Sequence, residues 1–196
     1  MAPFIFKNKS NYYCLIQATR LHNKKREIII LETKNFTKWS ESKFNLFKQN
    51  NNLFTPFYIK KDNRKYIFYS KDLKKILCSV YGNKLDRPLY EHLIIKSKLK
   101  GNTIYAPYII KIKNHYLMFY SLWENNEFGT INILKSKNLI NWSKTNFAIQ
   151  SFNRDVKIIS EPCIIHYNKK ILLFFEAKKK NNYWNIGYKV IDKIIL

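Results

Sequence analysis

The amino-acid sequence predicts an all-β fold, a β-propeller of four-stranded antiparallel blades built from about four repeats. Three observations predict it. Four prolines, Pro3, Pro56, Pro107 and Pro162, recur at spacings of 53, 51 and 55 residues. The same pair of short apolar runs follows each proline. Aromatic residues make up 16% of the chain and Gly only 4 positions, and aromatic side chains favour half-buried, pleated strands.

Each repeat opens with a predicted β-hairpin. One apolar run follows the proline directly, and a second begins nine or ten positions after the proline, beyond a polar turn. Two short apolar runs joined by a tight polar turn are typical of a hairpin and are too short for amphipathic helices. Both faces of these strands are apolar, so we expect adjacent blades to cover both. The expected strands are 4–6 and 12–16, 57–59 and 66–69, 108–110 and 116–120, and 163–165 and 171–175.

The third strand is visible as a second internal match. Residues 28–40 (IIILETKNFTKWS) and 131–143 (INILKSKNLINWS) agree at seven of thirteen positions without a gap, 103 residues apart. Further strands are expected at 75–80, 91–96 and 184–190. A β-sandwich also has many short strands, but its strands do not repeat strictly. We therefore predict one propeller domain over 1–196, with repeats at approximately 1–52, 53–103, 104–158 and 159–196.

The formal charge is +23, which by itself suggests a nucleic-acid or membrane partner. The Lys residues are scattered, however, and they accompany abundant Asn and Ile, whose codons are also A/T-rich. A basic platform for nucleic acid is therefore the last of three functional hypotheses.

Cysteine usage and the N-terminus restrict the class of protein further. Cys14, Cys78 and Cys163 are odd in number, show no CxxC spacing and lie in apolar runs, which predicts buried free thiols and no metal site. No Gly-rich phosphate loop is present, so no cofactor is expected. No signal peptide and no apolar run of about 18 residues is visible. We expect no membrane span and a cytoplasmic location, or secretion if an N-terminal segment precedes Met1.

Three motifs resemble a known superfamily. An Ala-Pro or acid-Pro pair opens a blade at 106–107 and 161–162, a hairpin reads APYIIKIKNHYLMFYS over 106–121, and an S-x-x-L-x-x-W element spans 136–142. These resemble the five-bladed propellers of glycoside hydrolase family 43 and its relatives, the arabinanases, β-xylosidases, levansucrases and invertases. Asn35 and Asn138 stand where that family usually has Asp. The resemblance implies five blades, and this chain supplies fewer than four. Either four blades close on their own, or the chain is a degenerate or partial member of the family.

The resemblance also implies a catalytic triad near the propeller axis: an Asp general base in the first blade, an Asp that tunes pKa values and a Glu general acid. Only Glu161 is an acid that precedes a blade proline. It matches the tuning Asp about as well as it matches the acid. Glu176 is the candidate for a second carboxylate. We therefore expect Glu161 and Glu176 to be catalytic if the chain is an enzyme.

Propeller geometry predicts where a ligand would bind. The residues before the prolines, Ala2, Thr55, Ala106 and Glu161, are expected at one mouth of the channel. The second strand runs back to the same end, where it brings the residue fourteen positions after each proline. Expected substrate contacts are Gln17, Thr55, Ser70, Tyr105, Ser121 and Trp123.

Aromatic faces beside polar groups suit sugar rings. We expect a carbohydrate partner, with a glycoside hydrolase and a catalytically inactive glycan-binding propeller as the first two hypotheses. Trp39 and Trp142 recur at one blade position and are expected in the core. His115 and His166 are expected in turns at the other mouth, without a catalytic role.

Overall fold

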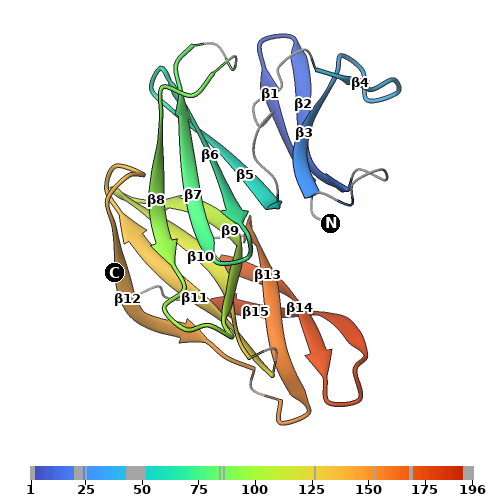
Figure 1. The fold of residues 1–196 in the computed structure, drawn as a ribbon, viewed down its shortest axis with the longest axis vertical. Coiled ribbons are helices and arrows are strands. Elements are labelled where there is room, and N and C mark those ends of the chain that lie inside the picture. The colour runs from blue at the N-terminus through green and yellow to red at the C-terminus, as the bar shows by residue number, and fades with distance from the viewer. Residues whose placement is uncertain are drawn as a thin grey trace. The chain divides into compact units, whose positions relative to one another are not determined.

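A computed structural model describes residues 3–19, 24, 26–42, 52–83, 85, 87–125, 127–151, 153–167 and 170–191. Ala2, which the sequence placed at the channel mouth, lies outside these residues. The described residues form fifteen β-strands and no helix (Figure 1). Among them no helix is long and apolar enough to cross a membrane. The chain divides into two compact units, residues 1–96 and 97–196, and each is described by itself.

The first unit contains two antiparallel sheets, and within each the strands follow one another in chain order. Each sheet begins with the hairpin that the sequence predicts after a proline. Apolar side chains of both sheets share one core, which includes Leu15, Ile28, Ile67 and Tyr69. Sheet 1 comprises β1 (Phe4–Asn8), β2 (Asn11–Thr19), β3 (Arg26–Thr33) and β4 (Ser40–Glu41), and sheet 2 comprises β5 (Leu53–Lys61), β6 (Arg64–Lys71), β7 (Lys75–Tyr81) and β8 (Tyr90–Lys96).

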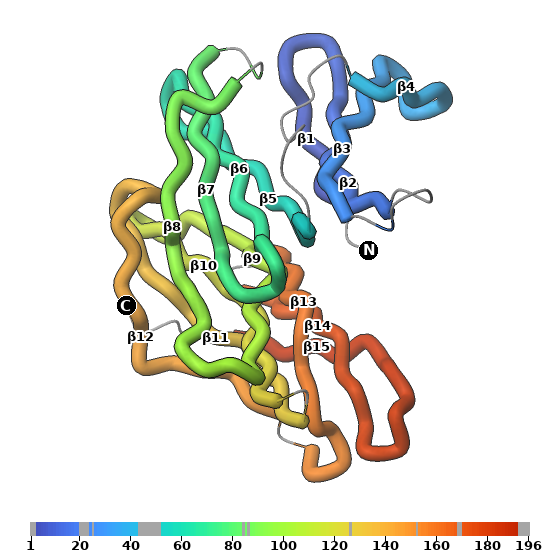
Figure 2. Tube along the Cα trace, viewed as in Figure 1, coloured from blue at the N-terminus to red at the C-terminus, as the bar shows by residue number. Residues whose placement is uncertain are grey.

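The second unit repeats this design. Sheets 3 and 4 meet at one parallel bridge between Gly129 and Ile158. A Cβ atom at Gly129 would lie 2.4 Å from Cγ2 of Ile158, so the close approach requires glycine. Sheet 3 comprises β9 (Thr103–Ile112), β10 (His115–Glu124), β11 (Phe128–Ser136) and β12 (Trp142–Ile149), and sheet 4 comprises β13 (Val156–Tyr167), β14 (Lys170–Lys179) and β15 (Trp184–Ile191) (Figure 2).

The S-x-x-L-x-x-W element forms the turn between β11 and β12. The Ser136 hydroxyl accepts the backbone N–H groups of Asn138 (3.1 Å) and Leu139 (2.9 Å), and the Asn138 side-chain oxygen accepts two further N–H groups. Thr33 and Asn35 make the corresponding bonds in sheet 1. The Asn side chains therefore supply the acceptor that this turn needs.

Two expectations about burial are wrong. Trp39 and Trp142 are half-buried and do not lie in the core. Trp142 donates its indole N–H to the carbonyl of Leu139 at 2.9 Å, and the Leu139 side chain is the one that is fully buried. Cys14 and Cys78 are buried as expected, but Cys163 is exposed. It shares an uncovered face of β13 with Ile165, whereas the intervening Ile164 points into the core.

Candidate functional site

The residues before three of the repeated prolines adopt an unusual backbone conformation. Thr55, Ala106 and Glu161 have φ values of 46°, 53° and 51°, in the left-handed region. A residue before proline is normally extended, and positive φ is uncommon for any residue with a Cβ atom. Each lies where the pairing of the first two strands shifts register, so each is part of a β-bulge. Strained backbone of this kind clusters at functional sites.

A side chain from the preceding sheet fixes two of these bulges. The Ser121 hydroxyl at the end of β10 accepts the backbone N–H of Glu161 at 2.8 Å. The side-chain oxygen of Gln17 on β2 accepts the N–H of Thr55 at 3.4 Å. Gln17 and Ser121 occupy the same repeat position, fourteen residues after the proline. Ser121 is fully buried, so its hydroxyl is closed to solvent and holds the backbone of the β13 bulge.

Two carboxylates lie close together on sheet 4. Glu161 is in the β13 bulge, and Glu176 on β14 pairs in register with Ser160, the residue before Glu161. Both side chains are half-buried. Burial raises the pKa of Glu161, and the negative charge of Glu176 raises it further. Glu161 therefore holds its proton to a higher pH than an ordinary glutamate.

Aromatic rings lie beside these carboxylates. Tyr105 contacts Trp123 edge-on, with ring centroids 5.5 Å apart, and Trp123 stacks on Trp184 at 6.1 Å. Burial raises the pKa of the Tyr105 phenol, and the charges of Glu161 and Glu176 raise it further, which places Tyr105 within electrostatic reach of both. Among the described residues, the buried indole N–H of Trp123 has no hydrogen-bond partner. Phenol, indole and carboxylates thus form one mixed polar and aromatic cluster, the Glu161 cluster.

The remaining predicted contacts belong to the first unit. Thr55 is buried and follows Phe54 on β5, and Ser70 is fully buried at the end of β6. Gln17 is half-buried and bonded to Thr55. The structure thus brings Gln17 and Thr55 together in one unit, and Tyr105, Ser121, Trp123, Glu161 and Glu176 together in the other.

The sequence did not predict the stacking of Trp184 on Trp123. Trp184 begins β15, and one repeat earlier the same position is Gly129, so the repeat pattern carries no signal for an aromatic residue there. Lys178 lies over the Trp184 ring, with its ammonium 5.6 Å from the centroid. A cation on an exposed aromatic face of this kind stabilises the ring's position.

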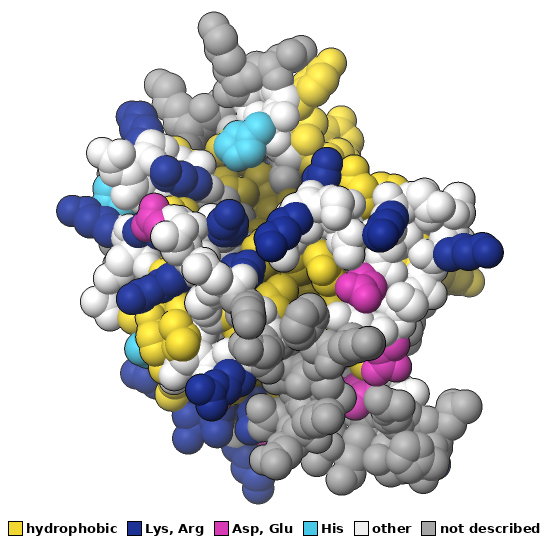
Figure 3. Space-filling model, turned by 90° about the horizontal axis from the view of Figure 1, so that it is seen from above, with side chains coloured by type: hydrophobic (Ala, Val, Ile, Leu, Met, Phe, Trp, Pro, Cys, Tyr) yellow, Lys and Arg dark blue, Asp and Glu magenta, His cyan; other side chains and the backbone are white. Residues whose placement is uncertain are grey.

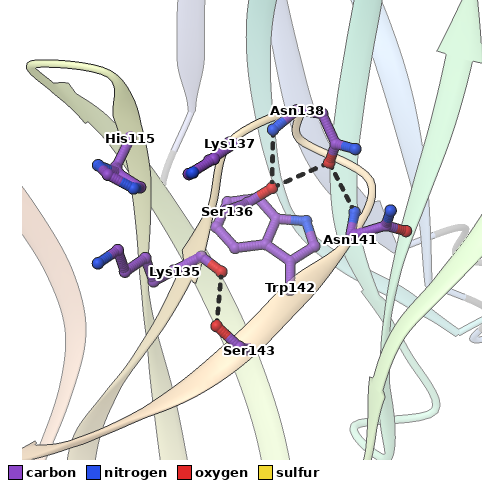
Figure 4. A pocket seen from close by; sticks show the side chains of 8 residues that line it. All are labelled: His115, Lys135, Ser136, Lys137, Asn138, Asn141, Trp142 and Ser143. Carbon is purple, nitrogen blue, oxygen red and sulfur yellow. Dashed lines mark hydrogen bonds between the residues drawn. The ribbon is translucent and has the colours of Figure 1, made fainter.

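A separate pocket of about 650 Å³ lies at the turn between β11 and β12 (Figure 4). Partial burial and the charges of Lys135 and Lys137 lower the pKa of His115, which lines this pocket. Glu161 and Glu176 do not contribute to it. Its lining residues are His115, Lys135, Ser136, Lys137, Asn138, Asn141, Trp142 and Ser143.

Figure 3 shows Lys and Arg side chains dispersed over the face in view, among uncharged ones. Across the described part of the chain, no group of three or more His, Cys, Asp or Glu side chains is placed to hold a metal ion.

Neither a protein-family model nor a curated protein sequence matches the chain. Solved structures do match it. A thermostable family-43 glycoside hydrolase is 14% identical with a TM-score of 0.82, over 96% of this chain and 70% of that one. The Cellvibrio cellulosa α-L-arabinanase in complex with arabinohexaose is 15% identical with a TM-score of 0.67, over 95% of this chain and 71% of the arabinanase.

A xylan β-1,4-xylosidase from Bacillus halodurans is 13% identical with a TM-score of 0.74, and the match covers all of this chain but 42% of the xylosidase. At these identities the likeness concerns the fold. The chain has the all-β, propeller-like fold of family-43 glycoside hydrolases. The repeats predicted the propeller, and the motifs predicted the resemblance to that family.

Proposed function

We propose that the chain is a carbohydrate-active propeller that hydrolyses O-glycosidic bonds of oligo- or polysaccharides at the Glu161 cluster. The observation that carries the proposal is a pair of neighbouring carboxylates, one of which, Glu161, has a raised pKa beside exposed and half-buried aromatic rings. The arabinohexaose bound to the structurally similar arabinanase supports carbohydrate as the ligand class.

Glycoside hydrolysis requires one carboxyl group that donates a proton and another that acts as base or nucleophile. A carboxyl group whose pKa is raised is suited to be the donor. In this proposal Glu161 protonates the leaving-group oxygen. The bulge directs this side chain away from the regular pleat, and the Ser121 hydroxyl fixes the backbone that carries it. Glu176 supplies the second carboxylate and favours the protonated form of Glu161.

The half-buried ring of Trp123 supplies the apolar surface on which a sugar ring stacks, because a pyranose or furanose has an apolar face. Tyr105 is buried and packs against Trp123. Their edge-on packing and the stacking of Trp184 hold Trp123 in place.

A second candidate function is glycan binding without hydrolysis. Thr55 and Ala106 occupy the bulge positions that Glu161 occupies in sheet 4, and neither carries a carboxyl group. The bulges therefore repeat while the acid does not. This observation favours a propeller that keeps the sugar site and lacks part of the catalytic set.

The test is turnover of arabino-, xylo- and fructo-oligosaccharides by the full chain, followed as released reducing sugar. Glu161→Gln is expected to lower the rate by roughly 10²-fold or more, because general acid catalysis contributes that much. Glu124→Gln removes an exposed carboxylate on β10 and is the matched control, with an unchanged rate expected. Equal turnover by Glu161→Gln would remove Glu161 from the mechanism. Binding by tryptophan fluorescence without turnover selects the second candidate.

A further inference from the structure

The pocket between β11 and β12, lined by His115 and by residues within 135–143, is called the turn pocket here. Its volume of about 650 Å³ is that of a site for a small ligand. His115 begins β10, and Lys135 and Lys137 flank the residue at which β11 ends. Among the described residues, no Asp or Glu lines this pocket. The turn pocket is therefore a concave surface whose charges are all of one sign.

The three basic groups lie close enough to affect one another. Partial burial and the charges of Lys135 and Lys137 lower the pKa of His115, because both disfavour the protonated imidazole. Figure 4 shows the three side chains on the same side of the Trp142 ring. A cleft lined by one sign of charge concentrates ions of the opposite sign. An anion bound among these groups would relieve their mutual repulsion.

The Trp142 indole separates the basic groups from two amides. Figure 4 shows Asn138 and Asn141 on the side of the ring that faces away from the basic side chains. The indole N–H is donated to the carbonyl of Leu139 at 2.9 Å, which fixes the half-buried ring and leaves its apolar face for a ligand. An aromatic face beside amide groups binds both the apolar face and the hydroxyls of a sugar ring.

Sheet 1 contains the same turn with different charges. Its Thr and Asn make the hydrogen bonds that Ser136 and Asn138 make in sheet 3. Glu32, however, stands where sheet 3 has Lys135. Asn11 stands where sheet 3 has His115. The turn therefore forms without these two basic side chains, and its folding does not explain why they gather in sheet 3.

We propose that the turn pocket binds an acidic sugar residue of a glycan, a sugar ring that carries a carboxylate. The carboxylate lies among His115, Lys135 and Lys137, which form charge-assisted hydrogen bonds with it. The apolar face of the sugar packs on Trp142, and the neighbouring Asn amides bond its hydroxyls. The site shares no residue with the Glu161 cluster, so it is separate from the proposed hydrolysis.

A nucleic acid fits this pocket less well than an acidic sugar does. Nucleic-acid sites follow successive phosphates along a basic track and stack several bases on aromatic rings. The turn pocket has its cations on one side of a single indole. On the face that Figure 3 shows, Lys and Arg side chains are dispersed and form no track. The pocket thus offers one cationic corner, one ring face and two amides.

The test is calorimetric titration of the full chain with trigalacturonate, with galactotriose as the neutral trisaccharide. Lys135→Gln with Lys137→Gln is expected to weaken trigalacturonate binding roughly tenfold or more, because hydrogen bonds to charged groups contribute that much. Lys34→Gln with Lys38→Gln removes the same charge from the exposed turn of sheet 1 and is the matched control. This control is expected to keep the affinity of the original chain.

A local measurement is the NMR shift of the His115 ring at constant pH, assigned with His115→Gln. The shift is expected to move with trigalacturonate and to stay in place with galactotriose. Glu161→Gln is expected to bind trigalacturonate as the original chain does, so failure of the hydrolysis proposal and failure of this one are distinguishable.

Several outcomes would overturn the proposal. Absence of trigalacturonate binding would do so, and equal binding of galactotriose would show that the cations do not select the ligand. Inorganic phosphate that binds as tightly as trigalacturonate would make the pocket a site for a simple anion. A single-stranded oligonucleotide that binds more tightly, and loses affinity in the Lys135→Gln with Lys137→Gln variant, would identify a nucleic acid as the partner.

Discussion

Replacing Ile131 and Ile186 by alanine, one at a time, compares the same repeat position in two different surroundings. The Ile131 side chain is fully buried between sheets 3 and 4, whereas Ile186 on β15 of sheet 4 is 82% exposed. Truncation of a buried isoleucine to alanine removes buried methyl groups and leaves a cavity, at a cost of roughly 2–5 kcal/mol in the free energy of unfolding. Truncation of an exposed side chain changes it by about 0.5 kcal/mol or less.

The packing around Ile131 indicates a cost in the middle of that range. Its neighbours in the core, Phe119, Ile159 and Leu173, come from facing sheets that are themselves held by strand pairing, so they collapse into the cavity only in part. A loss of about 3.5 kcal/mol corresponds to roughly 7–14 °C in Tm for a chain of this size.

Urea unfolding followed by circular dichroism gives the free energies for the original chain and both variants, with hydrogen exchange of β10 and β11 as a local readout. The expected result is a large loss for Ile131→Ala and almost none for Ile186→Ala. Equal losses at the two positions would refute the reasoning, because they would mean that Ile186 is buried in the folded chain as Ile131 is.

Three further predictions follow from individual contacts. Ser136→Ala removes the acceptor of two backbone N–H groups and is expected to lower the free energy of unfolding by about 1–3 kcal/mol. Ser143→Ala, at an exposed position, is the control and is expected to change that free energy by about 0.5 kcal/mol or less. Urea titration measures both. Glu161 has a raised pKa when folded, so the stability present below the ordinary glutamate pKa is lost as pH rises through the folded pKa. The Tm advantage of Glu161→Gln is therefore expected to grow as pH rises above about 4 and to level off once pH exceeds the folded pKa, and a pH-independent difference would contradict the raised pKa. Trp123→Ala is expected to weaken oligosaccharide binding by about tenfold, measured by fluorescence titration. Trp39→Ala is the control and is expected to retain the affinity of the original chain.

The hairpins and third strands could be predicted from the sequence because one local design recurs. Strands expected at 75–80 and 184–190 are β7 at Lys75–Tyr81 and β15 at Trp184–Ile191. Each apolar run forms one strand of a hairpin, and the polar turn between two runs fixes their register. The turn that Ser136 and Asn138 cap was visible for the same reason, since its acceptors are needed wherever the turn occurs.

Burial and backbone conformation at the site could not be predicted in this way. An apolar run indicates burial only if a neighbouring sheet covers it, which is why Cys163 was wrongly expected to be buried. The left-handed conformation of Thr55 and Glu161 opposes the local preference of a residue before proline, and tertiary hydrogen bonds from Gln17 and Ser121 hold it. The sequence placed Glu161 and Glu176 at one end of a blade, but the effect of Glu176 on the pKa of Glu161 depends on the β13 bulge.

The most direct test of the carbohydrate proposal is a crystal structure of the chain with arabinohexaose or xylohexaose, with Glu161→Gln used to prevent turnover. The account predicts a sugar ring against Trp123 and a glycosidic oxygen within hydrogen-bond distance of residue 161. A crystal soaked at saturating sugar that shows the oligosaccharide elsewhere, or none at all, would contradict it.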